Sequence, residues 1–406
     1  MFGIDAGTSC LIRRHVDPIF ALMRRIAAYL VLLTALLVTA LLAGCADGDP
    51  RAHAEAPAAP ILLGDDARVL RIGRTTTDAQ HRLQFSWPAS GFVFRFRGTA
   101  ARLLLNNEPL GDATPANDYI LVEIDDTPAR VYQLATGRHW YPIGRGISNG
   151  DHTVRVRKRT EAEVGMVMLE RVELPREGAV LAPPPKRPIR IEAIGDSITA
   201  GFGCEGQSPA CTFSARTENA LATYTALAAE RLHAEYSAVA WSGKGVYRND
   251  DSRDLETLPF LYDRSLAHAA MPLWRHSAHP VDVVVINLGT NDCARGDPPR
   301  QEFEHAFGDF VAHVREVQPR AFIALILGPM LYDEGRVQSR STVESVLNSV
   351  IAGRRARGDT NIDLLSIWAN PAEGVGCQFH PNRRAHARFA QELAAFLAPH
   401  VVNPKH

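Results

Sequence analysis

The rhythm of apolar residues changes once along the chain, at a proline-rich segment spanning residues 183–188. Before this segment, short apolar runs with a period of two are separated by Gly, Asn, Asp and Pro. After it, continuous apolar runs alternate with stretches of helical periodicity. The first pattern predicts an antiparallel β-sandwich or jelly roll, and the second predicts an α/β domain whose parallel sheet carries helices on both faces.

Proline fixes φ and withholds a hydrogen-bond donor, so the proline-rich segment is expected to form a stiff linker. The β-sandwich is therefore expected at residues 61–182 and the α/β domain at residues 186–402. The sandwich strands are expected at residues 83–87, 92–97, 119–124 and 153–157. In the α/β domain we expect strands at residues 189–194, 236–241, 281–288, 321–327 and 362–365, and helices at residues 223–232, 302–317, 341–356 and 383–397.

The N-terminal residues have the features of an export signal rather than of a folded domain. Two arginines, Arg24 and Arg25, precede an apolar run at residues 26–43, which has the length of a signal-peptide core or a short membrane span. The run leads into Leu42-Ala43-Gly44-Cys45, which resembles the lipobox of bacterial lipoproteins, where the cysteine is lipidated. An uncleaved single-span anchor is the alternative, and both put the folded domains outside the cytoplasm.

We accordingly assign residues 1–45 to a signal and lipobox region and residues 46–60 to a tether rich in Ala and Pro. The residues upstream of Met23 fit no signal pattern, so translation is expected to start at Met23. We expect an exported bacterial lipoprotein, held on the membrane by a lipid on Cys45 and facing the periplasm or the cell surface. Ala46, standing where an inner-membrane retention signal has Asp, favours the outer membrane.

The charge balance excludes one class of partner. The 406 residues hold 44 Lys and Arg against 45 Asp and Glu, a net charge of -1 with His neutral. Such a chain lacks the basic surface that binds nucleic acids or anionic lipids. No nucleic-acid partner is expected, and no protein partner is evident from the sequence.

Polar residues follow three of the expected parallel strands at the ends where ligands gather in such sheets. The first strand runs into Gly195-Asp196-Ser197, where an exposed nucleophile could be presented. The second opens into Ser242-Gly243-Lys244-Gly245, whose glycines let backbone N–H groups approach a ligand, and the third ends in Gly289-Thr290-Asn291-Asp292. His380 precedes the last helix, and an imidazole there could reach the serine and act as general base.

In this order, the blocks Gly-Asp-Ser-Ile-Thr, Ser-Gly-x-Gly, Gly-Thr-Asn-Asp and His-Pro resemble the four signature blocks of the SGNH (GDSL) hydrolases. Lys158-Arg159-Thr160-Glu161, Glu218-Asn219 and the segment from Trp241 to Tyr247 further resemble carbohydrate esterase family 2. That family joins a jelly roll to a flavodoxin-like SGNH domain and removes acetyl groups from plant polysaccharides such as xylan. The resemblance implies a serine acetyl esterase without a metal or organic cofactor.

The same resemblance implies roles for four residues. Ser197 would be the nucleophile that forms an acyl-enzyme, and His380 would be its general base. The Ser197 N–H, the Gly243 N–H and the Asn291 side chain would form the oxyanion hole. Acetylated polysaccharide or oligosaccharide is the expected substrate, with acetylated cell-wall glycan as the alternative.

The chain departs from the SGNH pattern beside the histidine. Many SGNH hydrolases carry an aspartate three residues before it, and this chain has Cys377 at that position. We expect a backbone carbonyl to orient His380, as in dyad-type members of the esterase family, with Glu373 or Asp363 as alternatives. A non-catalytic, glycan-binding surface lipoprotein with a decayed hydrolase domain is the competing interpretation, although all four signature residues are retained.

Four cysteines outside the export signal are candidates for disulfides in an oxidising compartment, namely Cys204, Cys211, Cys293 and Cys377. Cys204 and Cys211 enclose a short loop, so a local bridge between them is sterically easy. A bridge between Cys293 and Cys377 would clamp two active-site loops, with two buried free thiols as the alternative. The cysteines lie in no CxxC motif and the chain has no HExxH motif, so no metal site is expected.

Aromatic side chains beside such a site can stack on sugar rings. The candidate substrate contacts are Trp241 before the oxyanion glycine, Phe379 before the base, and Tyr247 in the long insertion after the second strand. Three further tryptophans are expected in the core, namely Trp87, Trp140 and Trp368.

Overall fold

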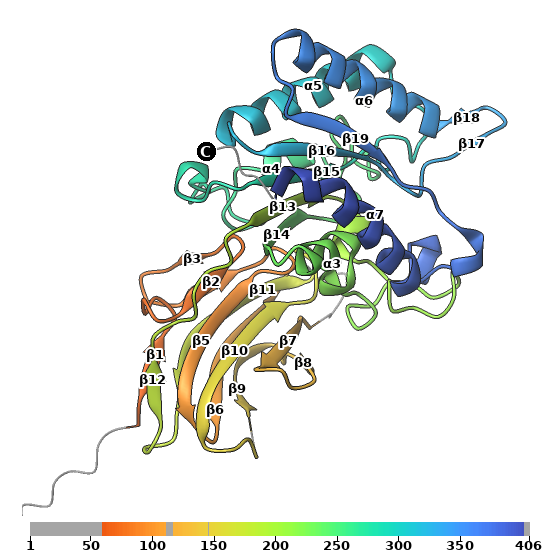
Figure 1. Ribbon diagram of the computed structural model, residues 1–406. Coiled ribbons are helices and arrows are strands. Elements are labelled where there is room, and N and C mark those ends of the chain that lie inside the picture. Colours follow the sequence, from red (N-terminus) through yellow and green to blue (C-terminus); the bar gives the residue numbers. More distant parts are fainter. Residues whose placement is uncertain (1–58, 111–116, 145, 402–406) are drawn as a thin grey trace, which may run out of the picture. The chain divides into compact units, whose positions relative to one another are not determined.

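The N-terminal domain consists of short antiparallel strands (Figure 1). The computed structural model describes residues 59–110, 117–144 and 146–401. The expected signal and lipobox region, Cys45 and the tether up to residue 58 lie outside these residues. Within the described ranges, no helix is both long enough and apolar enough to cross a membrane.

Two six-stranded sheets form the expected sandwich. The first sheet contains, in spatial order, β3 (Thr76–Thr77), β4 (Leu83–Phe85), β11 (Gly165–Glu173), β6 (Ala101–Pro109) and β9 (Gly137–Ile143), with β1 (Ile61–Leu63) also paired to β11. The second contains β12 (Ala179–Leu181), β5 (Gly91–Gly98), β10 (Gly150–Lys158), β7 (Tyr119–Ile124) and β8 (Arg130–Gln133), with β2 (Leu70–Ile72) also paired to β5. The paired strands of both sheets are antiparallel.

Phenylalanines supply much of the sandwich core. Phe92, Phe94 and Phe96 share one face of β5 because side chains alternate along a strand, and all three are fully buried. Neighbouring rings stack with their centroids 6.3 and 6.1 Å apart. Every second residue of β7 is buried in the same way. Apolar burial between two sheets therefore holds this domain together.

The C-terminal domain contains a five-stranded parallel sheet with the strand order β14 (Glu235–Ala240), β13 (Arg190–Gly195), β15 (Val283–Asn287), β16 (Phe322–Leu327) and β19 (Ile362–Ser366). This is the flavodoxin-like order, in which the second strand of the domain lies outside the first. Its main helices are α3 (Tyr224–Arg231), α5 (Arg300–Val317), α6 (Ser339–Ala356) and α7 (Arg383–Val401). Each strand and helix expected in this domain is present.

Shorter elements complete the domain. These are α2 (Ser197–Ala200), α4 (Leu258–Leu261), the hairpin of β17 (Asp333–Glu334) and β18 (Val337–Gln338), and the 3₁₀ helices η1 (Ala220–Ala222), η2 (His276–Ala278), η3 (Pro371–Glu373) and η4 (Cys377–Phe379).

Helices cover both faces of the parallel sheet (Figure 1). On one face, α5 and α6 bury Phe303, Phe307 and Val343 against the strands. On the other, α3 and α7 bury Tyr224 and Phe389. All residues of β15 and β16 are buried as a result. The loops at the carboxyl ends of the strands are where such a fold places its site.

The two domains share buried contacts, and the residues from Ala59 onward form one compact unit. Trp87 of the sandwich belongs to the same buried apolar cluster as Leu258 and Tyr262 of the α/β domain. Arg74 of the sandwich pairs with Glu192 of β13 at 3.0 Å, with both side chains almost fully buried. The sandwich therefore packs directly against the α/β domain.

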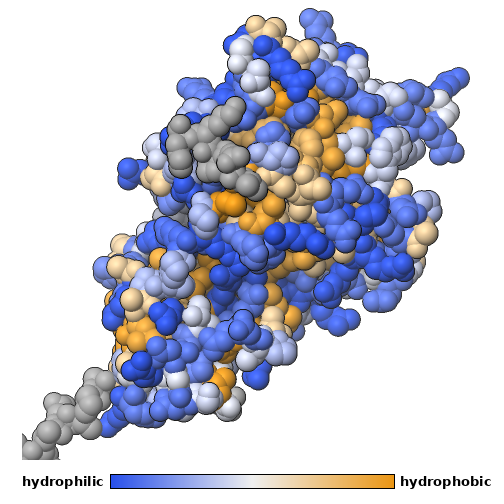
Figure 2. Space-filling view, in the orientation of Figure 1, coloured by the Kyte–Doolittle hydropathy of each residue, from blue (hydrophilic) through white to orange (hydrophobic). Residues whose placement is uncertain are grey.

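Of the three tryptophans expected in the core, one is buried and two are at the surface. Trp87 is fully buried, whereas Trp140 is 36% and Trp368 62% exposed. The guanidinium of Arg102 lies over the Trp140 ring and that of Arg340 over the Trp368 ring. Such cation–π contacts stabilise an aromatic ring at the surface. On the face shown in Figure 2, most of the surface is hydrophilic, and apolar residues gather over part of the upper half of the molecule.

Candidate active site

A serine stands where the first strand of the parallel sheet meets a helix. The connection from β13 to α2 requires glycine at position 195, because a Cβ there would lie 2.1 Å from Thr199 Oγ1. Asp196 caps α2, since its Oδ1 accepts a hydrogen bond from the Ile198 N–H at 3.0 Å. Ser197 is thus the first residue of α2, 8% exposed at the carboxyl end of the sheet.

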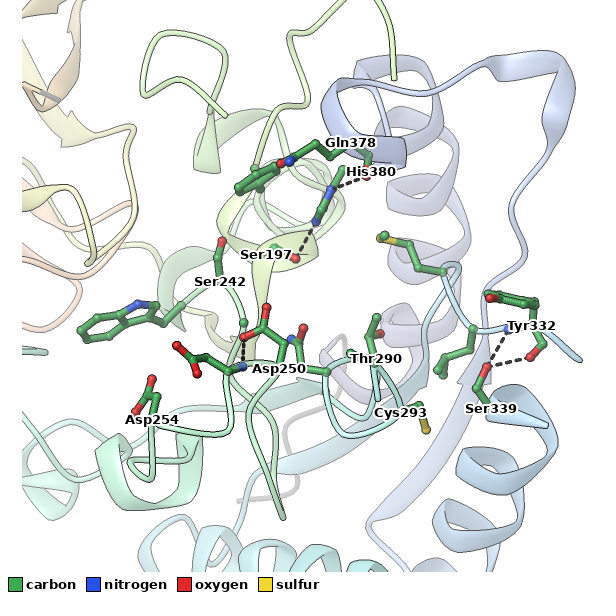
Figure 3. A pocket seen from close by; sticks show the side chains of 18 of the residues that line it. Ser197, Ser242, Asp250, Asp254, Thr290, Cys293, Tyr332, Ser339, Gln378 and His380 are labelled. Atoms are coloured by element: carbon green, nitrogen blue, oxygen red, sulfur yellow. Dashed lines mark hydrogen bonds between the residues drawn. The ribbon is translucent and has the colours of Figure 1, made fainter. Parts of the chain in front are cut away.

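The expected partner of this serine lies beside it. His380 Nε2 is 2.7 Å from Ser197 Oγ, although 183 residues separate the two in the sequence. The Phe202 ring packs against the imidazole with the ring centroids 4.4 Å apart. Figure 3 shows His380 between Ser197 and Gln378. The imidazole is therefore within the hydrogen-bond reach that a general base needs.

A backbone carbonyl orients the imidazole from its other side. His380 Nδ1 lies 3.2 Å from the carbonyl oxygen of Gln378. The two carboxylates that were alternatives are engaged elsewhere, because Glu373 pairs with Arg388 at 2.6 Å and Asp363 with Arg355 at 3.2 Å. With its proton on Nδ1 and donated to the carbonyl, the ring presents a free lone pair at Nε2 toward the serine.

Burial sets the protonation state of this histidine. Burial lowers the pKa of His380 below its ordinary value, and the hydrogen bond to the Gln378 carbonyl opposes that shift in part. The imidazole is therefore neutral at pH 7. A neutral imidazole can accept the serine proton, which a charged one cannot.

The segment that supplies the carbonyl has an unusual backbone. Gln378 and Phe379 have φ of +49° and +64°, a region that residues with a side chain rarely adopt. Hydrogen bonds hold it in place, from the Gln378 N–H to the Pro209 carbonyl and from the Cys377 N–H to the Gly203 carbonyl, both at 3.0 Å. Backbone strain of this kind persists where neighbouring contacts enforce it.

A disulfide ties the same segment to the loop after α2. Cys377 is bonded to Cys211, with their Cα atoms 4.8 Å apart. The expected pairs Cys204–Cys211 and Cys293–Cys377 are therefore wrong, and Cys204 and Cys293 are buried free thiols. Cys204 faces the interior, where its Sγ lies 3.7 Å from the Asn219 carbonyl oxygen, and this direction keeps it from its near neighbour in the sequence.

The second strand-end loop is a tight turn built around glycine. Its four residues run from Trp241 to Lys244, and the Lys244 N–H donates to the Trp241 carbonyl at 3.3 Å. Gly243 has φ of +78°, and a Cβ there would lie 2.6 Å from Asp250 Oδ1. Both the backbone angle and the lack of space therefore demand glycine.

The third loop brings an amide to the same place. Asn291 Nδ2 donates to the Lys244 carbonyl at 2.9 Å and has a longer contact of 3.4 Å to Asp196 Oδ2. Next to it, Asp292 Oδ1 accepts the backbone N–H groups of residues 246–248 at 2.7 to 3.1 Å. Burial raises the pKa of Asp292 above its ordinary value, and the hydrogen bonds from these three N–H groups oppose only part of that shift. Asn291 thus bonds to the turn itself, and Asp292 holds the backbone that follows the turn.

These loops surround a cleft of about 680 Å³ (Figure 3). Ser197, Gly243, Asn291 and His380 all line it, as the sequence predicted for one site. Of the candidate substrate contacts, Trp241 lines the cleft, whereas Phe379 and Tyr247 do not, and Phe379 is 69% exposed. Both Gln378 and Phe379 have a positive φ, and the Phe379 side chain lies in solvent.

Four acidic residues line the cleft. They are Glu163, Asp250, Asp251 and Asp254. Burial raises the pKa of Glu163 to about 7, and the charges of Glu161 and Asp250 raise it as well. In the part of the chain that the structure describes, no three His, Cys, Asp or Glu side chains come together as possible metal ligands.

Comparison with known proteins agrees with both halves of this architecture. Residues 71–184 match the N-terminal domain of carbohydrate esterase family 2, and residues 193–388 match the GDSL-like lipase/acylhydrolase family. A solved family 2 esterase with a carbohydrate-binding domain, from Corynascus thermopiles, is 30% identical, has a TM-score of 0.71, and is matched over 82% of this chain and 99% of that one. The chain belongs to carbohydrate esterase family 2. It is a serine esterase, as the resemblance implied.

Two curated relatives of this esterase are bacterial. The cellulase/esterase CelE of Acetivibrio thermocellus is 28% identical over 82% of the chain, which spans only 39% of that protein's length. An acetylxylan esterase/glucomannan deacetylase of Cellvibrio japonicus is 26% identical over 83% of the chain and 90% of the relative.

Sequence reasoning missed the parts of the site that arrive from far away. Glu163 belongs to the sandwich, and Tyr332 to the loop before β17, yet both line the cleft. Phe202, which packs on His380, follows α2 closely in the sequence but carries no sequence signal for that contact. The motif at residues 158–161 was the one indication that the sandwich of this esterase reaches the site.

Proposed function

We propose that Ser197 and His380 form the catalytic dyad of an esterase that removes acetyl groups from polysaccharides. The contact of 2.7 Å between Ser197 Oγ and His380 Nε2 carries the proposal. In the first step, Ser197 Oγ attacks the acetyl carbonyl carbon while His380 takes the hydroxyl proton. The Gln378 carbonyl holds the imidazole and stabilises the charged ring, in place of the triad carboxylate.

Three donors stabilise the tetrahedral intermediate in this proposal. They are the Ser197 N–H, the Gly243 N–H and the Asn291 side chain. The second hydrogen of Asn291 Nδ2 makes only the long contact to Asp196, so a substrate oxyanion can replace it. One such donor typically stabilises the transition state by about 2.7–4 kcal/mol.

The reaction then proceeds through an acetyl-enzyme. His380 returns its proton to the departing sugar oxygen, the bond between that oxygen and the acetyl carbon breaks, and the acetyl group remains on Ser197. Water next attacks the ester carbon, with His380 again taking the proton. Acetate leaves, Ser197 regains its proton, and no cofactor is consumed.

The shape and lining of the cleft support a glycan substrate. Trp241 and Tyr332 both line it, and flat aromatic rings pack well against sugar rings. The relative from Cellvibrio japonicus is named for acetylxylan and glucomannan. We propose acetylated xylan or a similar plant polysaccharide as the substrate.

Acetate release tests this proposal. The wild-type protein and the Ser197→Ala variant are incubated with a small activated acetyl ester, acetylated xylan and acetylated glucomannan. Release from the polysaccharides that disappears with Ser197 is expected. Release from the small ester alone would refute the polysaccharide, and release that survives Ser197→Ala would refute the dyad.

We also propose that the esterase is an exported lipoprotein, anchored through Cys45 and placed at the outer membrane. The lipobox-like end of the apolar run at residues 26–43 supports this location. Expression of the full chain in a bacterium, followed by membrane fractionation, tests it. The wild-type protein should pellet with outer membranes, and Cys45→Ala should remain uncleaved or lose its lipid. Equal release of both into the soluble fraction would refute the anchor.

A further inference from the structure

One loop of the sandwich, residues 158–161, enters the α/β domain with its charged side chains buried. Lys158 Nζ donates to the carbonyl oxygens of Thr160 at 3.0 Å and Glu161 at 2.6 Å, and it pairs with Asp118 at 2.7 Å. A buried cation that bonds to two successive main-chain carbonyls fixes the path of the loop. The Glu161 side chain is therefore held in one place.

Glu161 accepts hydrogen bonds from both donors of a single cleft residue. Its Oε2 accepts the Ser242 N–H and its Oε1 accepts the Ser242 hydroxyl, each at 2.5 Å. Glu161 is fully buried, and Ser242 lines the cleft beside Gly243 (Figure 3). Two parallel bonds to one charged carboxylate fix orientation as well as position.

A second buried carboxyl keeps Glu161 in its accepting form. Glu218 Oε2 accepts the Glu161 N–H at 3.0 Å. Burial raises the pKa of Glu218 well above its ordinary value, and the charge of Glu161 raises it further. Burial also raises the pKa of Glu161, whereas the Ser242 bonds and the Lys158 charge lower it. Both oxygens of Glu161 accept from donors of Ser242, as an ionised carboxylate does, and its charge favours the protonated form of Glu218.

The residue that Glu161 holds precedes the proposed oxyanion donor directly. Ser242 and Gly243 are the two central residues of the Trp241–Lys244 turn. The peptide between two central turn residues can face either way, which is the difference between type I and type II turns. The positive φ of Gly243 belongs to the second form. Bonds on both the N–H and the hydroxyl of Ser242 select that form.

We propose that Glu161 is a positioning residue supplied by the sandwich, which holds the Trp241–Lys244 turn so that the Gly243 N–H faces the oxyanion. The inference rests on the proposed role of Gly243. It makes the sandwich a part of the catalytic unit rather than a spacer or a binding module. Glu161 contacts no reacting atom, so its loss acts on kcat through Gly243 and leaves KM nearly unchanged.

Steady-state kinetics on an activated acetyl ester test this role. Glu161→Ala should lower kcat by about 30- to 100-fold, which is part of the effect of losing one oxyanion donor. Glu161→Gln should recover part of that loss, since its amide oxygen can still accept the Ser242 N–H. Ser242→Ala keeps that N–H bond and should lose about tenfold, and adding it to Glu161→Ala should cost nothing more.

Glu192→Gln is the matched control. Glu192 is also a buried glutamate at the domain interface, where it accepts from Arg74 and from the Tyr262 hydroxyl, but it does not line the cleft. Its substitution should lower the melting temperature as Glu161→Gln does, with kcat within about threefold of wild type. A kcat that falls equally in both variants, or a KM that rises in place of a fall in kcat, would overturn the proposal.

The rate at which an organophosphorus fluoride inactivates Ser197 separates this inference from the proposed substrate. The reagent uses the serine and the oxyanion hole but no glycan. A wild-type protein that reacts but releases no acetate would refute the substrate while its variants still report on Glu161. Slower inactivation of Glu161→Gln and Ser242→Ala is expected, and equal rates would overturn the role of Glu161. An unreactive wild-type serine would overturn both proposals.

Discussion

Breaking the Cys211–Cys377 disulfide should reduce stability far more than it reduces activity. The two cysteines are 166 residues apart, and the chain-entropy relation for a loop of that length gives about 5 kcal/mol at 25 °C. Measured contributions of disulfides to stability are commonly about 2–4 kcal/mol. They fall below the chain-entropy value because the unfolded chain retains some structure. We therefore expect Cys211→Ala to lower the free energy of unfolding by about 2–5 kcal/mol.

The effect on kcat should be smaller because the backbone bonds around the histidine remain. The Gln378 N–H still donates to the Pro209 carbonyl, and the Cys377 N–H to the Gly203 carbonyl. The Gln378 carbonyl should thus keep its place near Nδ1, with kcat within about tenfold of wild type.

Urea unfolding followed by tryptophan fluorescence, without reductant, measures the loss. Cys204→Ala is the control, because Cys204 is a buried free thiol close to the same loop and its loss should cost about 1 kcal/mol. Peptide mapping of the wild-type protein identifies the bridge directly. Equal destabilisation by the two substitutions, or a mapped Cys204–Cys211 bridge, would refute the reasoning.

Three further predictions concern the dyad and its surroundings. Gly243→Ala should lower kcat by about 100-fold or more, because its Cβ would lie 2.6 Å from Asp250 Oδ1. Gly335→Ala is the control and should leave kcat unchanged, because nothing lies within 4 Å of its Cβ. Burial lowers the pKa of His380 from 6.5, so kcat/KM should rise with pH through a pKa under 6.5 and then stay level. An acid limb of the pH profile centred above 6.5 would contradict this. Glu373→Gln should keep kcat within about threefold of wild type, because this carboxylate pairs with Arg388, and a loss of about 100-fold would show that it orients His380.

The fold was predictable because its signals are local. Period-two alternation marked strands such as β7, and continuous apolar runs marked the buried strands β15 and β16. The four site residues could be predicted for a related reason. Each follows a strand or precedes a helix at one edge of the sheet, so the topology of the sheet brings them together.

The rest depended on contacts that no local pattern encodes. The disulfide joins two cysteines that are 166 residues apart. Cys204 is closer to Cys211 in the sequence, but its side chain packs toward the Asn219 carbonyl instead. The exposure of Phe379 accompanies positive φ angles at Gln378 and Phe379, which the neighbouring sequence does not indicate. Glu163 reaches the site from another domain, so only the packing of the sandwich on the sheet reveals it. Glu161 belonged to a motif, but its bonds to Ser242 depend on that same packing.

The most direct test of the dyad is to find the acetyl-enzyme. Wild-type protein is quenched in acid during turnover of an activated acetyl ester, digested, and examined by peptide mass spectrometry. Our account predicts an acetyl group on Ser197, and neither the modification nor turnover in Ser197→Ala. An acetyl group trapped on another residue, or acetate release that continues in Ser197→Ala, would contradict it.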